Sequence, residues 1–194
     1  ARTLEMEDEF DAVLTDPPYY DNIIYSEISD FFYVWQRILL SDEYEQFEPT
    51  ETPRAESIVA NPAQNKGAEE FESELGEAFG NIHRMLKQDG AVVFTYHHAG
   101  VESWGELLQA LCQQDFEVTA TYPINADENK FIGGEAVTFD IVIVARPATE
   151  REPISWNSLR RNIYRTAQIT RKRLEENRDL SRGDIGVVEM GRCF

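Results

Sequence analysis

The sequence predicts an α/β fold, with a largely parallel sheet, helices on its faces and a further helix toward the C-terminal end. Short apolar runs alternate with longer stretches in which apolar residues recur at helical spacing, which is typical of parallel strands joined by helices. The last two apolar runs follow each other without a helical stretch between them, which indicates an antiparallel pair at the sheet edge. The 194 residues suffice for one domain with a core of its own.

The first strand is expected at residues 11–15, an apolar run that stops at an Asp-Pro-Pro turn. A helix follows over residues 25–40, where large apolar residues recur every three or four positions. Four aromatic side chains of this helix are expected in the core rather than in an exposed stacking surface: Phe31, Phe32, Tyr33 and Trp35. Residues 41–67 are polar and contain three prolines, so we expect either a mobile target-recognition loop or a disordered connection.

Regular patterns resume after residue 68 and divide the chain into two parts. Helices are expected over residues 69–86, 104–114 and 155–178, and strands over residues 91–96, 116–122 and 137–145. Asp89-Gly90 is expected to end the first of these helices, and Gly133-Gly134 to turn the chain between the last two strands. We therefore predict an α/β domain at residues 1–149 and a basic helical extension at residues 150–194.

The chain is strongly acidic, with 36 Asp and Glu against 18 Lys and Arg and a formal net charge of −18. Most positive charges are arginines, and residues 150–194 hold ten basic side chains against seven acidic ones. A surface of this charge repels itself in dilute buffer, whereas multi-molar salt screens the repulsion to within a few ångströms. We therefore expect a protein adapted to high salt, as in a halophile; the alternative is an ordinary acidic protein.

The sequence offers no sign of a membrane segment or of an oxidising environment. No apolar run is long enough to span a membrane, and the first residues lack the basic and apolar blocks of a signal peptide. The two cysteines, Cys112 and Cys193, lie in no metal-binding spacing and indicate no disulfide framework. We therefore expect a cytoplasmic protein with reduced thiols, no metal site and no membrane partner.

The candidate site is the segment Asp16-Pro17-Pro18-Tyr19, at the C-terminal end of the first expected strand. Open α/β sheets bind ligands at this edge. The prolines stiffen the turn and lack amide donors, so the Pro17 carbonyl is available beside the Asp16 carboxylate. Two adjacent acceptors suit an NH₂ group, because engaging both hydrogens turns the nitrogen lone pair toward an electrophile. Tyr19 offers a flat face on which a base can stack, worth about 1–3 kcal/mol.

This tetrapeptide resembles the catalytic motif of the S-adenosylmethionine-dependent DNA amino-methyltransferases. The run from Thr15 to Trp35, and an Asp-Gly pair before a strand that ends in Thr95-Tyr96-His97-His98, resemble the large adenine-specific DNA methylases of archaea and bacteria. The resemblance spans about residues 10–147 and implies a partial Rossmann-like methyltransferase sheet. It also implies S-adenosylmethionine as cofactor, DNA as partner and an adenine amine as target, in a base that is flipped out of the duplex. In these enzymes the Asp and first Pro of the motif polarise the amine, and its Tyr stacks on the base.

The glycine-containing loop that holds the cofactor in this family has no counterpart in the sequence, since Gly133-Gly134 lies between two late strands. The cofactor-binding residues are therefore unknown. We expect the chain to be the catalytic half of a longer domain and to be inactive by itself. Its expected partners are the missing N-terminal half and, through the exposed edge of the first strand, a second copy of the chain.

Five further residues are expected near the substrate: Tyr20, Asp21, Asn22, His97 and His98. The first three follow the motif, where Asp21 or Asn22 either orients the substrate or caps the next helix. The histidines end the strand beside the catalytic one, so they either line the pocket or are ordinary polar residues at a strand end.

Two other functions fit the same residues. In the first, the chemistry is kept and the substrate is an RNA base or a protein side-chain amide. In the second, the chain is a non-catalytic module that binds nucleic acid through the arginine-bearing helix at residues 155–178, in particular through Arg160, Arg161 and Arg165. An equally good interpretation is that the arginines form a solvent-exposed helix face, which pairs with the acidic residues of the rest of the chain.

Overall fold

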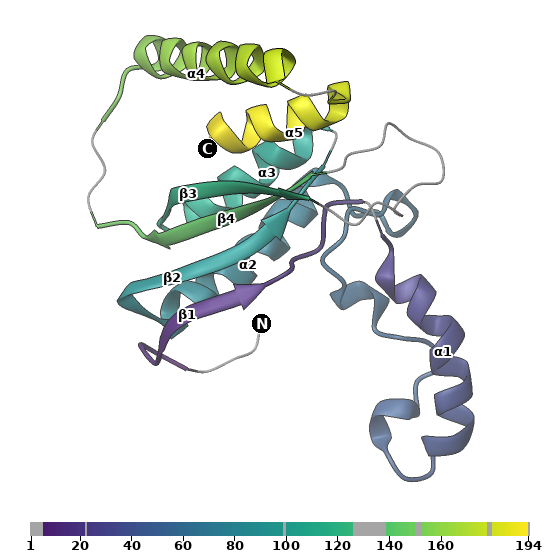
Figure 1. Ribbon diagram of the computed structural model, residues 1–194. Coiled ribbons are helices and arrows are strands. Elements are labelled where there is room, and N and C mark those ends of the chain that lie inside the picture. The colour runs from purple at the N-terminus through teal and green to yellow at the C-terminus, as the bar shows by residue number, and fades with distance from the viewer. Residues whose placement is uncertain are drawn as a thin grey trace.

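The computed structural model describes residues 6–21, 23–98, 100–125, 139–149, 153–177 and 180–193. Four strands form an open sheet, and five α-helices accompany it within these ranges (Figure 1). The elements are β1 (Phe10–Thr15), α1 (Tyr25–Leu40), α2 (Ala68–Met85), β2 (Leu86–Tyr96), α3 (Val101–Gln113), β3 (Phe116–Asn125), β4 (Phe139–Pro147), α4 (Trp156–Asn177) and α5 (Arg182–Cys193). Three short 3₁₀ turns lie between α1 and α2: η1 (Glu45–Phe47), η2 (Arg54–Glu56) and η3 (Pro62–Gln64).

The sheet has the strand order β1-β2-β4-β3. β1 and β2 are parallel, with Thr15 opposite Phe94, whereas β4 runs antiparallel to both β2 and β3. The predicted α/β class and the antiparallel pair at the sheet edge are therefore confirmed. The sheet is mixed rather than largely parallel, because β4 inserts between β2 and β3 instead of extending the parallel pair.

The junction between α2 and β2 differs from the sequence prediction. Asp89-Gly90 does not end the helix: α2 stops at Met85, and β2 begins at Leu86, which pairs with Phe10. The register then shifts between Phe10 and Ala12, which marks a bulge. A Cβ at Gly90 would lie 2.9 Å from the Lys87 carbonyl oxygen and 3.2 Å from that of Phe10. The glycine is thus needed for close backbone approach inside the strand, and the predicted helix end at Asp89-Gly90 is wrong.

The core lies on one face of the sheet, under α2, α3 and α5. Phe79 of α2 packs on Phe94, with ring centroids 5.5 Å apart, and Trp104 of α3 packs edge-on against Tyr96 at 5.1 Å. Ile141 is opposite Tyr96 in the ladder and therefore on the same face. A Cβ at Gly191 of α5 would lie 3.0 Å from the Ile141 side chain, so α5 covers this face as well. Val187 and Val188 of α5 belong to the same buried cluster.

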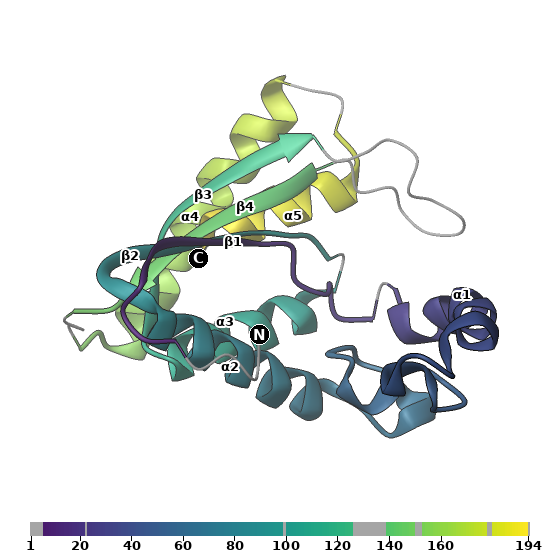
Figure 2. The same cartoon turned by 90° about the horizontal axis from the view of Figure 1, so that it is seen from below.

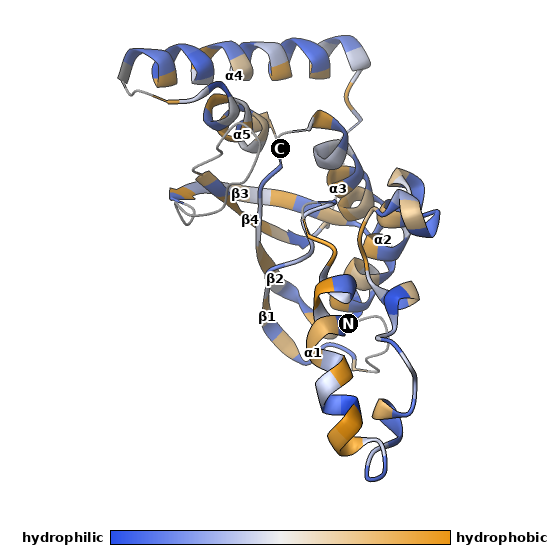
Figure 3. Ribbon diagram, turned by 90° about the vertical axis from the view of Figure 1, so that its right-hand side faces the viewer, coloured by the Kyte–Doolittle hydropathy of each residue, from blue (hydrophilic) through white to orange (hydrophobic). Residues whose placement is uncertain are grey.

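The opposite face of the sheet is open. Leu14, Val93, Val144 and Ala120 form one row across the four strands on this face. In the described part of the chain no helix covers the row where it crosses β1 and β2, and Figure 3 shows α2 and α3 on one side of these strands only. Leu14 is 77% exposed. In an all-parallel α/β sheet both faces are normally covered by helices, whereas the described residues place helices on one face of the parallel pair β1–β2 only.

Helix α1 forms at the predicted residues but projects away from the sheet beyond β1 (Figures 1 and 2). Its aromatic residues are not in the core, contrary to the prediction: only Tyr33 is buried, and Trp35 is 62% exposed. Six of its exposed apolar residues form one stripe along the helix: Ile28, Phe31, Phe32, Trp35, Ile38 and Leu39.

The polar face of α1 contacts the segment that follows the helix. Residues 41–56 fold back on it, and Asp30 accepts hydrogen bonds from the Thr52 amide (2.9 Å), the Thr52 hydroxyl (2.6 Å) and Arg54 Nε (2.8 Å). The Thr52 hydrogen bonds and the Arg54 guanidinium lower the pKa of Asp30 to about 2. Tyr33 and Arg37 donate to the Pro49 carbonyl at 2.9 and 2.8 Å. This ordered clamp contradicts the disordered alternative for the connection.

Helix α4 agrees with the predicted helix over residues 155–178 and packs on α5, outside the core layer (Figure 1). Helix α5 was not predicted, because its mixture of glycine, acidic and apolar residues has no clear helical pattern. None of the helices in the described ranges combines the length and the apolar composition that crossing a membrane requires.

The Asp30 clamp is testable by proteolysis. Replacing Asp30 with Ala removes the acceptor shared by Thr52 and Arg54, so the segment loses its main side-chain contacts with α1. We expect limited proteolysis within residues 41–56 to become faster, because this segment then separates more often from the helix. Asp42→Ala, at an exposed carboxylate just after α1, is the matched control and is expected to leave the cleavage rate unchanged.

The packing of α2 on α3 is expected to depend on pH. Burial, the hydrogen bond to Glu72 and the neighbouring Glu102 and Glu69 carboxylates raise the pKa of Glu106 to about 7. The folded state therefore binds more protons than the unfolded state between about pH 4.5 and 7, and stability falls as pH rises through this window. We expect Glu106→Gln to raise the unfolding free energy at pH 8 by about 0.5–1 kcal/mol, after allowance for solvent screening, and to have little effect at pH 5.

Urea denaturation at the two pH values, at low salt, measures this difference. Glu77→Gln on the exposed side of α2 removes the same charge and serves as the control. An equal effect of both variants at pH 8 would show that overall net charge, rather than the Glu72–Glu106 contact, sets the dependence.

Candidate active site

The segment Asp16-Pro17-Pro18-Tyr19 follows β1 directly, at the edge where β2 also ends. Because β1 and β2 are parallel and Thr15 lies opposite Phe94, Asp16 emerges beside Thr95. Pro17 is buried, Pro18 and Tyr19 are partly buried, and Asp16 is exposed. The turn is thus anchored by a buried proline ring, while its carboxylate faces solvent at the sheet edge where α/β proteins bind ligands.

One oxygen of Asp16 is held by two hydroxyl groups. Tyr19 and Thr95 both donate to Asp16 Oδ1, and their hydroxyl oxygens lie 2.7 Å from each other. Within the described ranges, Asp16 Oδ2 accepts no hydrogen bond. The carboxylate is therefore fixed in orientation through Oδ1 and retains Oδ2 as an acceptor for a ligand.

The ring of Tyr19 is held in place by two neighbours on β2. Its centroid lies 5.4 Å from that of Tyr96 and 4.7 Å from that of His97, both in edge-on arrangements. Burial and the hydrogen bond to Asp16 raise the pKa of the Tyr19 hydroxyl, so it remains a proton donor across the physiological range. The sequence suggested only a stacking role for Tyr19, whereas the structure also makes it the residue that orients Asp16.

His97 is paired with a carboxylate that the sequence analysis missed. Its Nδ1 contacts Asp140 Oδ1, and both side chains are buried. Asp140 belongs to β4 and lies next to His97 in the ladder that joins β4 to β2. Asp140 is the one charged residue in the otherwise apolar run 137–145, and this feature of the sequence could have marked it as a functional candidate. The pair sets the orientation of the imidazole on which the Tyr19 ring rests.

Tyr20, Asp21 and His98 form a second group beside the first. His98 Nδ1 accepts from the Gly100 amide at 2.9 Å, which places the ring proton on Nε2, 3.0 Å from Asp21 Oδ1. Tyr20 has a positive φ of 57° and packs edge-on against His98, with centroids 5.5 Å apart. The structure therefore brings all but one of the predicted substrate residues to one edge, and Asn22 lies outside the described residues.

Comparison of the chain with family models, with curated proteins and with solved structures finds no match. The chemistry of the site is therefore argued from its own atoms. A fixed carboxylate with one free oxygen, beside a rigid aromatic ring at an exposed sheet edge, is suited to a flat ligand that carries a hydrogen-bond donor.

The glycine that follows the histidine pair leaves no room for a ligand beside it. Gly100 lies two residues after His98, and a Cβ there would lie 3.1 Å from the His98 ring, so this space is already filled. Gly133-Gly134 lies outside the described ranges. Among the residues that the structure describes, no three histidine, cysteine or acidic side chains form a metal-binding group.

The hydroxyl pair on Asp16 is expected to act as a unit. Tyr19→Phe and Thr95→Val each remove one donor to the carboxylate, and each is expected to destabilise the fold by about 1–2 kcal/mol. Because both donors share one oxygen, the double variant should deviate from additivity by about 0.5–1 kcal/mol. Denaturation of the four proteins measures the coupling, and Thr95→Ser, which keeps the hydroxyl, should restore it. Strict additivity would contradict the shared-oxygen geometry.

Proposed function

We propose that this chain provides the substrate side of an S-adenosylmethionine-dependent amino-methyltransferase that acts on the exocyclic amine of a nucleic-acid base, with DNA adenine as the first target. The observation that carries the proposal is the free Oδ2 of Asp16, held beside the Tyr19 ring at the exposed end of β1. The resemblance of the tetrapeptide to the amino-methyltransferase motif points in the same direction.

The proposed role of Asp16 and Pro17 is to engage both hydrogens of the target amine. An NH₂ group has two donors, so Asp16 Oδ2 accepts one and the Pro17 carbonyl accepts the other. A nitrogen held in this way has its lone pair turned out of the ring plane. S-adenosylmethionine, when bound, supplies an electrophilic methyl group whose bonding electron pair stays on sulfur. The amine loses one proton as it gains the methyl group, and the Asp16 carboxylate is the acceptor nearest to it.

Tyr19 is proposed to stack on the base while its hydroxyl keeps Asp16 aligned. His97 and Asp140 act as positioning residues, because they fix the ring on which Tyr19 rests and are themselves buried away from the ligand. A base inside a duplex cannot reach this site, since its amine is already hydrogen-bonded to the opposite strand. The target must therefore be unpaired or flipped out.

The alternatives differ in what is bound at this edge. An RNA base offers the same amine and ring, and a protein side-chain amide offers the amine without the ring. A binding module without catalysis requires neither Asp16 nor Tyr19, and its support is the basic surface of α4. The exposed carboxylate with a free oxygen favours an amine-directed reaction over the module.

Transfer of a labelled methyl group from S-adenosylmethionine to DNA tests the proposal. We would assay the protein in its full natural length, from low salt to multi-molar KCl, and identify the methylated base by mass spectrometry. Asp16→Asn is expected to lower the rate by about 10²–10⁴-fold, the range of a lost acid–base group. Asp11→Asn, at the other end of the same strand, is the matched control and is expected to retain the wild-type rate.

The outcomes separate the alternatives. Transfer to RNA or protein but not to DNA would change the substrate and keep the chemistry. Equal rates for the Asp16 and Asp11 variants would assign the transfer to other residues. No transfer to any of these substrates, with the cofactor demonstrably bound, would refute the proposal.

A further inference from the structure

Helix α4 contains a stretch without a single carboxylate in an otherwise acidic chain. Residues 153–174 hold six basic side chains and no Asp or Glu, although 36 of the 194 residues are acidic and a stretch of this length with average composition would hold about four. Most of the described residues of α4 are exposed and none is buried. The local charge is therefore opposite to that of the rest of the molecule and is presented to solvent.

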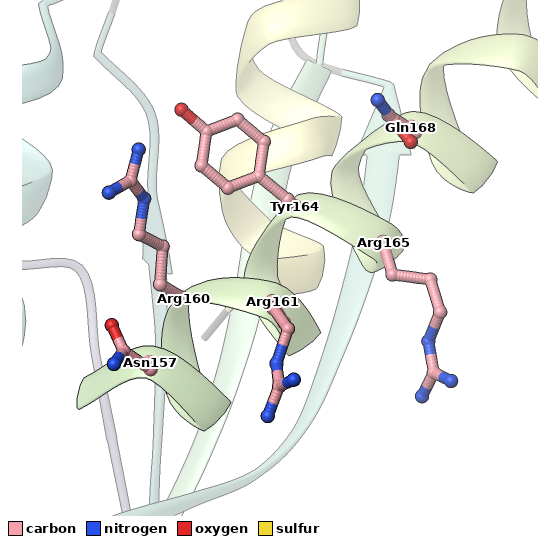
Figure 4. Close-up of a pocket in the computed structure, with 6 residues that line it drawn as sticks. All are labelled: Asn157, Arg160, Arg161, Tyr164, Arg165 and Gln168. Carbon is pink, nitrogen blue, oxygen red and sulfur yellow. The ribbon is translucent and has the colours of Figure 1, made fainter. Parts of the chain in front are cut away.

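Three arginines lie within the first three turns of α4; Arg161 and Arg165 point the same way, whereas Arg160 turns toward Tyr164 (Figure 4). Figure 4 shows the side chains that line a shallow hollow of about 730 Å³ there: Asn157, Arg160, Arg161, Tyr164, Arg165 and Gln168. The Arg160 guanidinium lies 5.5 Å from the centre of the Tyr164 ring, and Tyr164 is 57% exposed. This surface, the α4 basic surface, combines guanidinium groups, amides and one aromatic ring.

These arginines differ from the basic residues further along the helix. Arg171 is neutralised by Glu189 of α5 at 2.5 Å, and Lys172 lies 3.8 Å from Glu176. Within the described ranges, Arg160, Arg161 and Arg165 have no acidic partner; Arg161 makes only a hydrogen bond to the Ser158 hydroxyl at 3.3 Å. The positive charge at the start of α4 is therefore available to an external anion.

We propose that the α4 basic surface binds the sugar-phosphate backbone of nucleic acid. A guanidinium group matches the geometry of a phosphate with two parallel hydrogen bonds, which explains arginine in place of lysine here. From Asn157 to Gln168 the helix extends over about 17 Å at 1.5 Å per residue, which corresponds to about five nucleotides of one strand at 3.4 Å each. Tyr164 adds a ring on which an unpaired base can stack.

The surface is separate from the candidate active site. β4 runs antiparallel to β2. The C-terminal end of β4, which leads toward α4, therefore lies at the opposite end of the strands from Thr95 and His97. Figure 1 shows the first turns of α4 above that end, away from the segment between β1 and α1. The inference thus adds a second contact to nucleic acid, and it stands independently of methyl transfer because binding can be measured without the cofactor.

Salt-dependent binding of a labelled DNA oligonucleotide, followed by fluorescence anisotropy, tests the inference. If the arginines neutralise three phosphates, a plot of log K against log salt has a slope of about −2.7 for a duplex, at about −0.9 per phosphate, and of about −2.1 for a single strand, at about −0.7 per phosphate. In the triple variant Arg160→Gln/Arg161→Gln/Arg165→Gln we expect the slope to approach zero and the affinity at the lowest salt to fall at least tenfold. The triple Arg→Lys variant keeps the charges and is expected to retain most of the slope.

A matched pair of single variants refines the test. Arg161→Gln is expected to reduce the slope by about 0.9, as for one lost phosphate contact, whereas Arg171→Gln should change it less because Glu189 already neutralises that guanidinium. Circular dichroism at each salt concentration verifies that every variant is folded.

Two outcomes would overturn the inference. One is an unchanged slope in the triple Gln variant. The other is a wild-type chain that does not bind DNA but forms a dimer which the same variant abolishes, since the arginines would then bind the acidic surface of a second copy. Analytical ultracentrifugation distinguishes this case.

Discussion

The candidate site depends on one carboxylate oxygen that is shared by two hydroxyl groups. Asp16 Oδ1 joins the turn after β1, through Tyr19, to the end of β2, through Thr95. The parallel register of β1 and β2 makes this contact possible, because it brings both strand ends to one edge. Tyr19 then rests on His97, and His97 on Asp140 of β4, so three of the four strands determine the position of one exposed carboxylate.

In the described part of the chain, helices cover mainly one face of the sheet. The helices α2, α3 and α5 bury one face of the sheet, while Leu14 and the row across Val93 and Val144 face the other way. Helix α1 repeats this asymmetry on a smaller scale, since its polar face binds residues 41–56 and its apolar stripe faces solvent. In both places the side that faces the rest of the chain makes specific contacts. The exposure of apolar surface is therefore a consequence of how the chain folds and not of a failure to fold.

The sequence was sufficient for most elements because their periodicity is local. The strand at β1, the helices at α1 to α4 and the antiparallel pair of β3 and β4 are all found where apolar spacing places them. The location of the aromatic residues of α1 was predicted wrongly, because periodicity shows that a helix has an apolar side but does not show what that side contacts. The same limit applies to Gly90, whose role depends on the Phe10 backbone across the sheet.

At the site, the motif residues were identified from their order in the sequence. The residues that hold them in place were not identified in this way. Thr95 and Asp140 act through partners that are distant in the chain, at separations of 79 and 43 residues. Only the strand register brings them together, and no single-sequence pattern contains that register. The pairing of His97 with Asp140 therefore required the order β2-β4 before it could be inferred.

The exposed stripe of α1 and the open sheet face also affect how stability responds to temperature. The heat capacity of unfolding comes mainly from apolar surface that is newly hydrated, and about 2.5 kcal/mol/K is typical for a chain of this length. Side chains such as Leu14, Trp35 and Leu39 are already hydrated in the folded chain and contribute little to that change. The curve of folding free energy against temperature is consequently shallower than the length of the chain suggests, and cold denaturation is displaced to lower temperature.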